Sequence, residues 1–188
     1  MTGLVPTMED SMRALFPILG VLLLAFPFSA VDADAASINI VALGASGTAG
    51  RGQGRHSGGV SQDEAFPAQL EGMLRARGYD AQVTNAGIAG DTTDGMLSRL
   101  DSSVPAGTKL VILQPGTNDG RHGSSAGASV NVPQIIQKLK ARGIKVIMAN
   151  MSSASAHIGP DGQHLTAQGQ SLVAAHLLPQ VIAAIGKR

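Results

Sequence analysis

The chain has 188 residues, of which 44% are hydrophobic and 14% charged, which suits one ordinary domain with a buried core and excludes global disorder. Cysteine is absent, which excludes a disulfide framework, a thiolate nucleophile and any cysteine-based metal site. The net charge is +1 and the aromatic residues are four Phe and one Tyr, so neither a strongly charged partner nor a base-stacking nucleic-acid surface is expected.

The first 35 residues are typical of a secretory signal peptide. Arg13 precedes an uncharged apolar stretch over residues 14–30, and small residues that suit signal cleavage follow it. Met12 is an alternative start, because acidic residues come before it. An uncleaved membrane anchor is the other interpretation, but the stretch contains two prolines and is short for a span. We therefore expect an exported protein, periplasmic or secreted, with one mature domain over residues 36–188 and no stable membrane span after cleavage.

Strands and helices alternate along the expected mature domain. Apolar, β-rich runs predict four strands, at residues 37–44, 81–85, 109–114 and 144–149. Apolar residues at helical spacing predict four helices, over residues 66–78, 91–100, 133–143 and 166–185, the third with Pro133 in its first turn and the last with a possible kink at Pro179. The Gly- and Ser-rich segments between them predict loops, at residues 45–62, 115–130 and 150–165. This alternation predicts an α/β fold, a three-layer sandwich with a parallel sheet between two layers of helices.

Ligands of such a sheet bind beyond the carboxyl ends of its strands. Polar residues follow all four predicted strands there: Ser46 and Thr48; Asn85 and residues 87–91; Thr117, Asn118 and Asp119; and Ser152, Ser153, Ser155, His157, Asp161 and His164. One edge of the sheet thus gathers a hydroxyl, glycine amides, a carboxamide, a carboxylate and an imidazole. These groups are the parts of a serine hydrolase site.

Four short blocks at these strand ends resemble the SGNH hydrolases, also called the GDSL esterase/lipase family. The blocks are Ala42–Gly50 (ALGASGTAG), Asn85–Thr92 (NAGIAGDT), Gly116–Asp119 (GTND) and Asp161–His164 (DGQH). They occur in family order, and the chain looks most similar to small secreted bacterial esterases of the thioesterase and lysophospholipase type. The resemblance implies a flavodoxin-like sheet of about four to five strands. It also implies an exported serine esterase that cleaves short- to medium-chain carboxylic esters, small-molecule or lipid, through an acyl-enzyme, without metal or cofactor.

The same resemblance implies a role for five residues. Ser46 is the nucleophile, His164 the general base, and Asp161 the residue that orients the base. The backbone N–H groups of Ser46 and Gly90, with the Asn118 side chain, form the oxyanion hole. A serine hydroxyl needs an adjacent imidazole to remove its proton, and the imidazole needs a carboxylate to fix its tautomer. Each oxyanion donor is typically worth about 3 kcal/mol.

Two features depart from the family pattern. Ala45 stands where the family usually has an aspartate that is thought to brace the nucleophile loop. The segment from Met148 to His164 is short and leaves no room for a further helix and strand, so we expect the sheet to stop at four strands. Part of the acyl-binding wall is then missing, and we expect an open pocket that selects short acyl chains.

Other interpretations of the same residues remain open. Residues 44–50 also resemble a glycine-rich dinucleotide loop of a Rossmann-type protein, although more loop follows where a helix should open, and Asn85 stands where an acidic residue is expected. Ala45 also fits a catalytically weak or inactive binding protein on the same fold. His157 competes with His164 as the base. The remaining charged and imidazole side chains are expected to be structural or on the surface: Asp91 and Asp119; Arg51, Arg55 and Arg121, which could also attract an anionic substrate group; and His56, His122 and His176.

Overall fold

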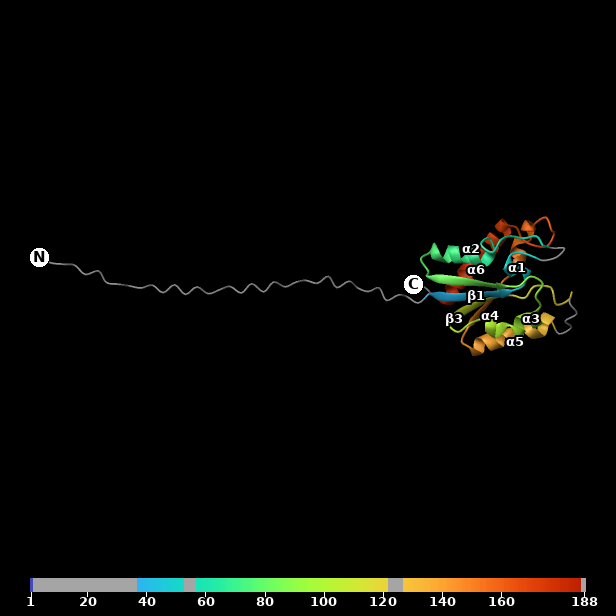
Figure 1. Ribbon diagram of the computed structural model, residues 1–188, viewed down its shortest axis with the longest axis horizontal. Coiled ribbons are helices and arrows are strands. Elements are labelled where there is room, and N and C mark those ends of the chain that lie inside the picture. Colours follow the sequence, from blue (N-terminus) through green and yellow to red (C-terminus); the bar gives the residue numbers. More distant parts are fainter. Residues whose placement is uncertain (2–36, 53–56, 122–126, 187–188) are drawn as a thin grey trace. The chain divides into compact units, whose positions relative to one another are not determined.

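The computed structural model describes Met1 and residues 37–52, 57–121 and 127–186 (Figure 1). The predicted signal peptide therefore lies, apart from Met1, outside the described residues, and so does the alternative start at Met12. Residues 35–188 form one compact unit. Within the described ranges, no helix is both long enough and apolar enough to cross a membrane.

The described residues form the predicted sandwich, with a parallel sheet of four strands in the order β2-β1-β3-β4. The strands are β1 (Ile38–Gly44), β2 (Ala81–Gly87), β3 (Thr108–Gln114) and β4 (Lys145–Met148). The helices are α1 (Ser46–Ala49), α2 (Phe66–Arg75), α3 (Thr93–Ser98), α4 (Leu100–Ser103), α5 (Gly127–Ala141), the 3₁₀ helix η2 (Met151–His157) and α6 (Ala167–Ile185). Figure 1 shows α2 and α6 on one face of the sheet and α3, α4 and α5 on the other. The α/β fold class and the end of the sheet after four strands are thus confirmed.

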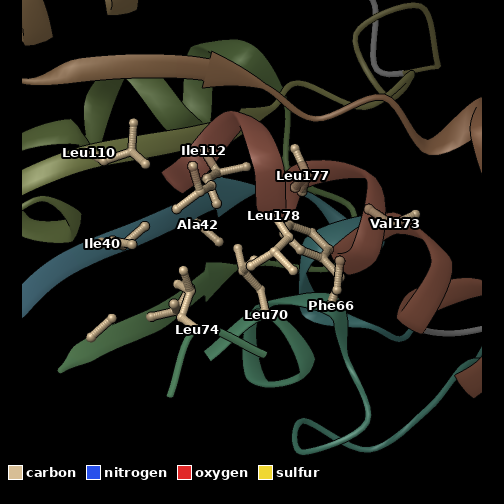
Figure 2. Close-up of a cluster of buried hydrophobic side chains, with 14 of the residues drawn as sticks. Ile40, Ala42, Phe66, Leu70, Leu74, Leu110, Ile112, Val173, Leu177 and Leu178 are labelled. Carbon is tan, nitrogen blue, oxygen red and sulfur yellow. The ribbon is translucent and has the colours of Figure 1, made fainter. Parts of the chain in front are cut away.

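The two central strands, β1 and β3, carry the core on both of their faces. Successive side chains of a strand point to opposite faces, so a strand covered on both sides is apolar throughout. Figure 2 shows the cluster between the sheet and helices α2 and α6: Ile40, Ala42, Leu110 and Ile112 from the strands, with Phe66, Leu70, Leu74, Val173, Leu177 and Leu178 from the helices. The intervening strand residues pack with α3, α4 and α5: Val41, Leu43, Val111 and Leu113. Both layers fix the carboxyl ends of β1 and β3, from which the candidate site emerges.

Two helices begin at threonine caps; the sequence indicates Thr166 for the last helix, and either Asp91 or Thr92 for the second. Thr92 Oγ1 accepts a hydrogen bond of 3.2 Å from Gly95 N at the start of α3. Thr166 Oγ1 accepts one of 3.3 Å from Gly169 N at the start of α6. Each cap satisfies a backbone N–H that has no acceptor within its own helix. Helix α6 continues through Pro179 to Ile185.

Helix α5 begins six residues before the predicted start, so the placement of Pro133 in its first turn was wrong. The helix runs from Gly127, and Pro133 lies inside it. Residues 127–132 (GASVNV) are poor helix formers apart from Ala128, which is why the pattern favoured a loop. A tertiary contact overrides that preference: the buried Asn131 side chain donates to Thr93 Oγ1 at 3.0 Å and to Asp94 Oδ1 at 2.6 Å.

Two further segments predicted as loops contain short helices. The first turn after β1 is α1, and the segment after β4 contains η2. Asn150 caps η2, because its Oδ1 accepts a hydrogen bond of 3.0 Å from Ser152 N. Both helices are shorter than two turns of an α-helix, too short for apolar periodicity to reveal them.

Candidate active site

A cavity of about 280 Å³ opens at the carboxyl ends of β1 and β3. In the sheet, β2 lies on one side of β1 and β3 lies on the other, so the strand order reverses between β1 and β3. Ligands of open parallel sheets bind at such a reversal, beyond the carboxyl ends of the strands. The lining residues come from α1, the loop after β3, η2 and the loop before α6: Ser46, Gly47, Gln114, Gly116, Thr117, Asn118, Met151, Ser152, Ser155, Ile158, Gln163, His164 and Leu165. Three of the five predicted site residues, Ser46, Asn118 and His164, therefore line one cavity.

Ser46 is the first residue of α1, directly after the end of β1. The carbonyl oxygen of Ala45 accepts hydrogen bonds from Thr48 N at 3.1 Å and from Ala49 N at 3.0 Å, which closes this four-residue helix. Glycine is required at Gly87 on β2, because a Cβ there would collide with the backbone of Thr48 and Ala49. The turn that carries Ser46 is thus packed directly against the sheet.

His164 and Asp161 form a close pair. His164 Nδ1 lies 2.6 Å from Asp161 Oδ2, and Asp161 Oδ1 accepts hydrogen bonds from His164 N at 2.9 Å and from Gln163 N at 3.0 Å. The hydrogen bond from the His164 ring, with those from the backbone, lowers the pKa of Asp161 well below its ordinary value, so this carboxyl is ionised. An ionised carboxylate at Nδ1 keeps the proton on that nitrogen and leaves Nε2 as the acceptor.

The other ring nitrogen of His164, Nε2, is buried without a hydrogen-bond partner among the described residues. The whole side chain is buried as well. Buried polar atoms without a partner are rare in folded proteins and often mark functional positions. His164 thus carries an unpaired ring nitrogen and lines the same cavity as Ser46.

The loop that carries His164 is closed at its base by backbone hydrogen bonds. Gly159 N donates to His164 O at 2.7 Å, and Thr166 N donates to His157 O at 2.9 Å. Gly162 turns the loop with a positive φ of +69°, a conformation that favours glycine. These bonds join the loop to the first residues of α6, so the imidazole is carried on a fixed support.

Of the oxyanion candidates, Asn118 lines the cavity and Gly90 does not. The Asn118 side chain is buried, and its Nδ2 donates to Asp91 O at 2.8 Å. A carboxamide nitrogen carries two N–H groups, so this bond fixes the rotamer and leaves one N–H for a ligand. Gly90 has a φ of +81° in the turn just before Asp91. The Asn118 bond to Asp91 O thus links the two predicted segments.

The two remaining aspartates of the motifs are structural, as predicted. Asp119 is buried and accepts hydrogen bonds from Thr93 N and Thr93 Oγ1, both at 2.8 Å, at the start of α3. Asp91 Oδ2 pairs with Arg99 Nε at 2.8 Å, and Arg99 Nη2 donates to Gly44 O at 3.1 Å. The arginine therefore ties the end of β1 to the loop after β2, a role that the sequence did not indicate.

The other predicted candidates lie away from the cavity lining. His157 ends η2 and is half-buried, and His176 is exposed on α6. Arg121 Nη1 donates to the cavity-lining Gln163 Oε1 at 3.3 Å, and Arg51 is exposed. Arg55, His56 and His122 lie outside the described residues. The described part of the chain contains no cluster of three or more His, Asp or Glu side chains that could hold a metal ion.

Several residues around the site escaped the sequence-based prediction. Gln114 and Gln170 contact the turn that carries Ser46, and Gly58 packs on Asp161. Gln114 carried a weak signal, since a polar residue at the end of a buried strand needs a specific partner. Gln170 and Gly58 carried none, because their contacts join segments far apart in the chain. The strand β1 leads into the four-residue α1 and not into a long helix, which disfavours a dinucleotide site after Gly44–Gly50.

Comparison with known proteins identifies relatives of this chain. Residues 42–185 match the model of the GDSL-like lipase/acylhydrolase family. An esterase TesA of Pseudomonas aeruginosa is 37% identical over 95 residues, which are 48% of this chain and 46% of that protein. An arylesterase of Vibrio mimicus is 33% identical over 88 residues, which are 46% of this chain and 44% of that protein.

A solved structure of a TesA protein has the same fold. It superposes with a TM-score of 0.66 at 22% identity and covers 78% of this chain and 99% of the solved chain. The sequence matches to the two esterases each span about half the length of those curated relatives. The family match, by contrast, includes all four motif blocks and most of the chain. The chain therefore belongs to the GDSL-like lipase/acylhydrolase family, the SGNH hydrolases that its motifs resemble.

Proposed function

We propose that this protein is a serine esterase that cleaves carboxylic esters through an acyl-enzyme on Ser46. The observation that carries the proposal is the environment of the His164 ring: Nδ1 lies 2.6 Å from Asp161 Oδ2, Nε2 is buried without a hydrogen-bond partner among the described residues, and His164 lines the same cavity as Ser46. An imidazole held in this way can act as a general base and accept a hydroxyl proton at Nε2. Membership of the GDSL-like family and the names of the two esterase relatives support the same reaction class.

In the proposed reaction, Ser46 Oγ attacks the ester carbonyl carbon while His164 Nε2 takes the hydroxyl proton. The negative charge that develops on the carbonyl oxygen is stabilised by the free N–H of Asn118 and the backbone N–H groups of Ser46 and Gly90. The C–O bond of the alcohol breaks, and the alcohol leaves with the proton from His164. Water then attacks the acyl-enzyme, His164 takes its proton, and the carboxylic acid is released as Ser46 recovers its proton. Asp161 remains ionised throughout and orients the ring.

The lining of the cavity favours a short- to medium-chain acyl group. Met151, Ile158 and Leu165 contribute apolar surface, while Ser152 and Ser155 contribute hydroxyls. Apolar side chains suit the acyl chain, and hydroxyls suit the ester and alcohol groups. Oxygen esters, thioesters and lysophospholipids share an acyl carbonyl, and a substrate panel that contains all three classes distinguishes among them.

The test of this proposal is hydrolysis of p-nitrophenyl acyl esters with covalent labelling by a fluorophosphonate. The wild type should hydrolyse the ester and take up one label at Ser46. Ser46→Ala should lose both, while Ser98→Ala, a change at an exposed serine on α3, should lose neither. Absence of hydrolysis and of labelling in the folded wild type would identify a catalytically inactive binding protein and refute the proposal.

We also propose that the protein is exported and that residues 1–35 are removed. The basic start, the apolar stretch over residues 14–30 and the small residues that follow support this proposal. Expression of the full chain in a bacterium, followed by fractionation and mass determination of the N-terminus, tests it. A mature chain that begins near Ala36 in the periplasm or medium is expected. An intact N-terminus in the cytoplasm would contradict export.

A further inference from the structure

The turn that carries Ser46 rests on the carboxamide of Gln114. This residue ends β3 and is buried, with 7% of its surface exposed. Its Oε1 accepts hydrogen bonds from Ala45 N at 3.2 Å and from Thr48 Oγ1 at 3.3 Å. A Cβ added to Gly47 would lie only 3.0 Å from the same oxygen. One side-chain oxygen thus contacts the chain on both sides of Ser46, and Ser46 itself lines the cavity.

A second glutamine, from a different element, holds the same turn. Gln170 on α6 is almost fully buried, and its Nε2 donates to Gly47 O at 3.3 Å. Its Oε1 accepts a hydrogen bond of 3.0 Å from Phe66 N, the first residue of α2. The turn is therefore fixed to β3 by Gln114 and to α6 by Gln170. Helix α6 follows the loop that carries His164, so these contacts connect the supports of the nucleophile and the base.

Ala45 cannot supply such support itself. Its side chain is a buried methyl group, 1% exposed, and takes no part in hydrogen bonding. Its backbone N–H would be buried without a partner if Gln114 were apolar, at a cost of about 1–3 kcal/mol. The turn could avoid this cost by rotating toward solvent, where water would accept the hydrogen bond from the Ala45 N–H. Such a rotation would carry Ser46 away from His164. Displacement of a reacting atom by about 1 Å can cost on the order of 100-fold in rate.

We propose that Gln114 is a positioning residue for the nucleophile: its carboxamide oxygen holds the turn Ala45–Thr48 so that Ser46 and its backbone N–H keep their reactive geometry. This inference rests on the proposed esterase function. The support is uncharged, so it does not depend on pH and places no negative charge beside the developing oxyanion. A carboxylate at the same position would accept the same two hydrogen bonds but would oppose that charge.

Two substitutions at Gln114 separate these effects. Gln114→Met removes the acceptor and keeps the approximate volume; kcat should fall by about 10- to 100-fold with KM changed less than about threefold, and fluorophosphonate labelling of Ser46 should slow in parallel. Gln114→Glu keeps the acceptor; its kcat should lie above that of Gln114→Met at low pH and decline as the carboxylate ionises, a pH dependence absent from the wild type. Val181→Ala, a core truncation on α6 remote from the cavity, is the control for loss of stability and should leave kcat unchanged.

Amide hydrogen exchange of residues 44–49 provides a measurement that does not need activity. Exchange should be slow in the wild type and in Gln114→Glu and faster in Gln114→Met, with the rest of the sheet unchanged. The proposal is overturned if Gln114→Met keeps kcat within threefold of the wild type, or if Gln114→Glu is no better than Gln114→Met at any pH. It is also overturned if exchange does not change. A wild type that neither hydrolyses esters nor takes up the label refutes the esterase function instead, and exchange then decides whether Gln114 holds the turn.

Discussion

The imidazole of His164 and the turn that carries Ser46 are supported by groups of different kinds. His164 is held by the ionised carboxylate of Asp161, and the turn of Ser46 by the neutral carboxamide of Gln114. A carboxylate suits the ring because it would stabilise the imidazolium that the proposed reaction forms. A neutral amide suits the turn of Ser46 because the oxyanion of the proposed reaction would form beside it. The support of the ring is thus an anion, whereas the support of the serine turn carries no charge.

The first prediction concerns the orienting carboxylate. Asp161→Asn should lower kcat very roughly 10⁴-fold, because the amide N–H of asparagine would face Nδ1 and favour the wrong tautomer of His164. The measurement is steady-state hydrolysis of a p-nitrophenyl ester, with circular dichroism to verify the fold. Asparagine keeps one oxygen for the backbone N–H groups of Gln163 and His164, so the loop should stay intact. A loss below tenfold would assign Asp161 a structural role only.

The lowered pKa of Asp161 predicts a dependence of stability on pH. Its hydrogen bonds to the His164 ring and backbone favour the ionised carboxyl in the folded state. The resulting stabilisation is complete above the unfolded pKa of about 3.9 and is lost as the pH falls below it toward the folded value. Urea unfolding at a series of pH values should therefore show a constant advantage of wild type over Asp161→Asn above about pH 5, and a shrinking advantage below about pH 4. Parallel curves over the whole range would contradict the lowered pKa.

A glycine outside the motifs provides the next prediction. A Cβ at Gly58 would lie 2.7 Å from both Cγ and Oδ2 of Asp161, closer than real Cβ contacts. Gly58→Ala should therefore displace the carboxylate from His164 and lower kcat by tenfold or more, since small displacements are costly in catalysis. The matched control is Gly72→Ala on α2, where a Cβ meets nothing within 4 Å and should stabilise the helix by about 0.5–1 kcal/mol. Equal kcat in the two variants would show that the carboxylate tolerates the methyl group.

At the scale of elements, the site depends on where strands and helices end. The sequence predicted the ends of β1 and β3 because apolar runs stop there. It predicted the starts of α3 and α6 because capping residues precede them, Asp91 or Thr92 for α3 and Thr166 for α6. It did not predict the early start of α5, which depends on the hydrogen bonds of Asn131 to another helix. Local patterns thus identified the ends that local chemistry determines, whereas ends fixed by tertiary contacts were missed.

Helix α2 protects the outer edge of the sheet, which gives a prediction about stability. Glu71 Oε2 accepts a hydrogen bond of 2.7 Å from Val83 N on the edge strand β2, and Glu71 Oε1 pairs with Arg75 at 3.0 Å. Glu71→Ala should leave the buried Val83 N–H unpaired and lower the free energy of unfolding by about 1–3 kcal/mol. Glu71→Gln, which keeps an acceptor oxygen, should lose less. Urea denaturation of the three proteins measures this order, and equal loss in both variants would contradict the edge contact.

At the scale of the whole molecule, the motif blocks could be placed at one edge of the sheet because parallel strands share the direction of their carboxyl ends. Three of the five implied site residues line one cavity. A fourth, Asp161, contacts one of these three, His164. Gly90 could not be placed in this way, because the orientation of a turn amide depends on backbone angles that residue types do not specify. The supports Gln114, Gln170 and Gly58 were missed for a related reason: each contact joins segments that are distant in the chain.

The size of the cavity predicts the acyl-chain preference of the proposed esterase. The cavity measures about 280 Å³, just below the usual range of about 300–1,000 Å³ for small-molecule pockets, and the four-stranded sheet adds no further wall. Each buried methylene contributes about 0.8 kcal/mol, and methylenes beyond the cavity stay in water and contribute nothing. We therefore expect kcat/KM for p-nitrophenyl esters to be highest between acetate and about hexanoate and to level off or fall with longer chains.

The measurement uses esters from two to sixteen carbons, below micelle-forming concentrations, with wild type and Met151→Ala. Met151 lines the cavity, and its terminal carbon lies close to Gly47 beside the nucleophile. Truncation of this side chain enlarges the cavity, so the preferred acyl chain should become longer while acetate hydrolysis changes little. A wild-type profile that climbs steadily beyond ten carbons would contradict the argument from cavity size. Such a profile would require apolar surface outside the cavity and would favour a lipid substrate over a small soluble ester.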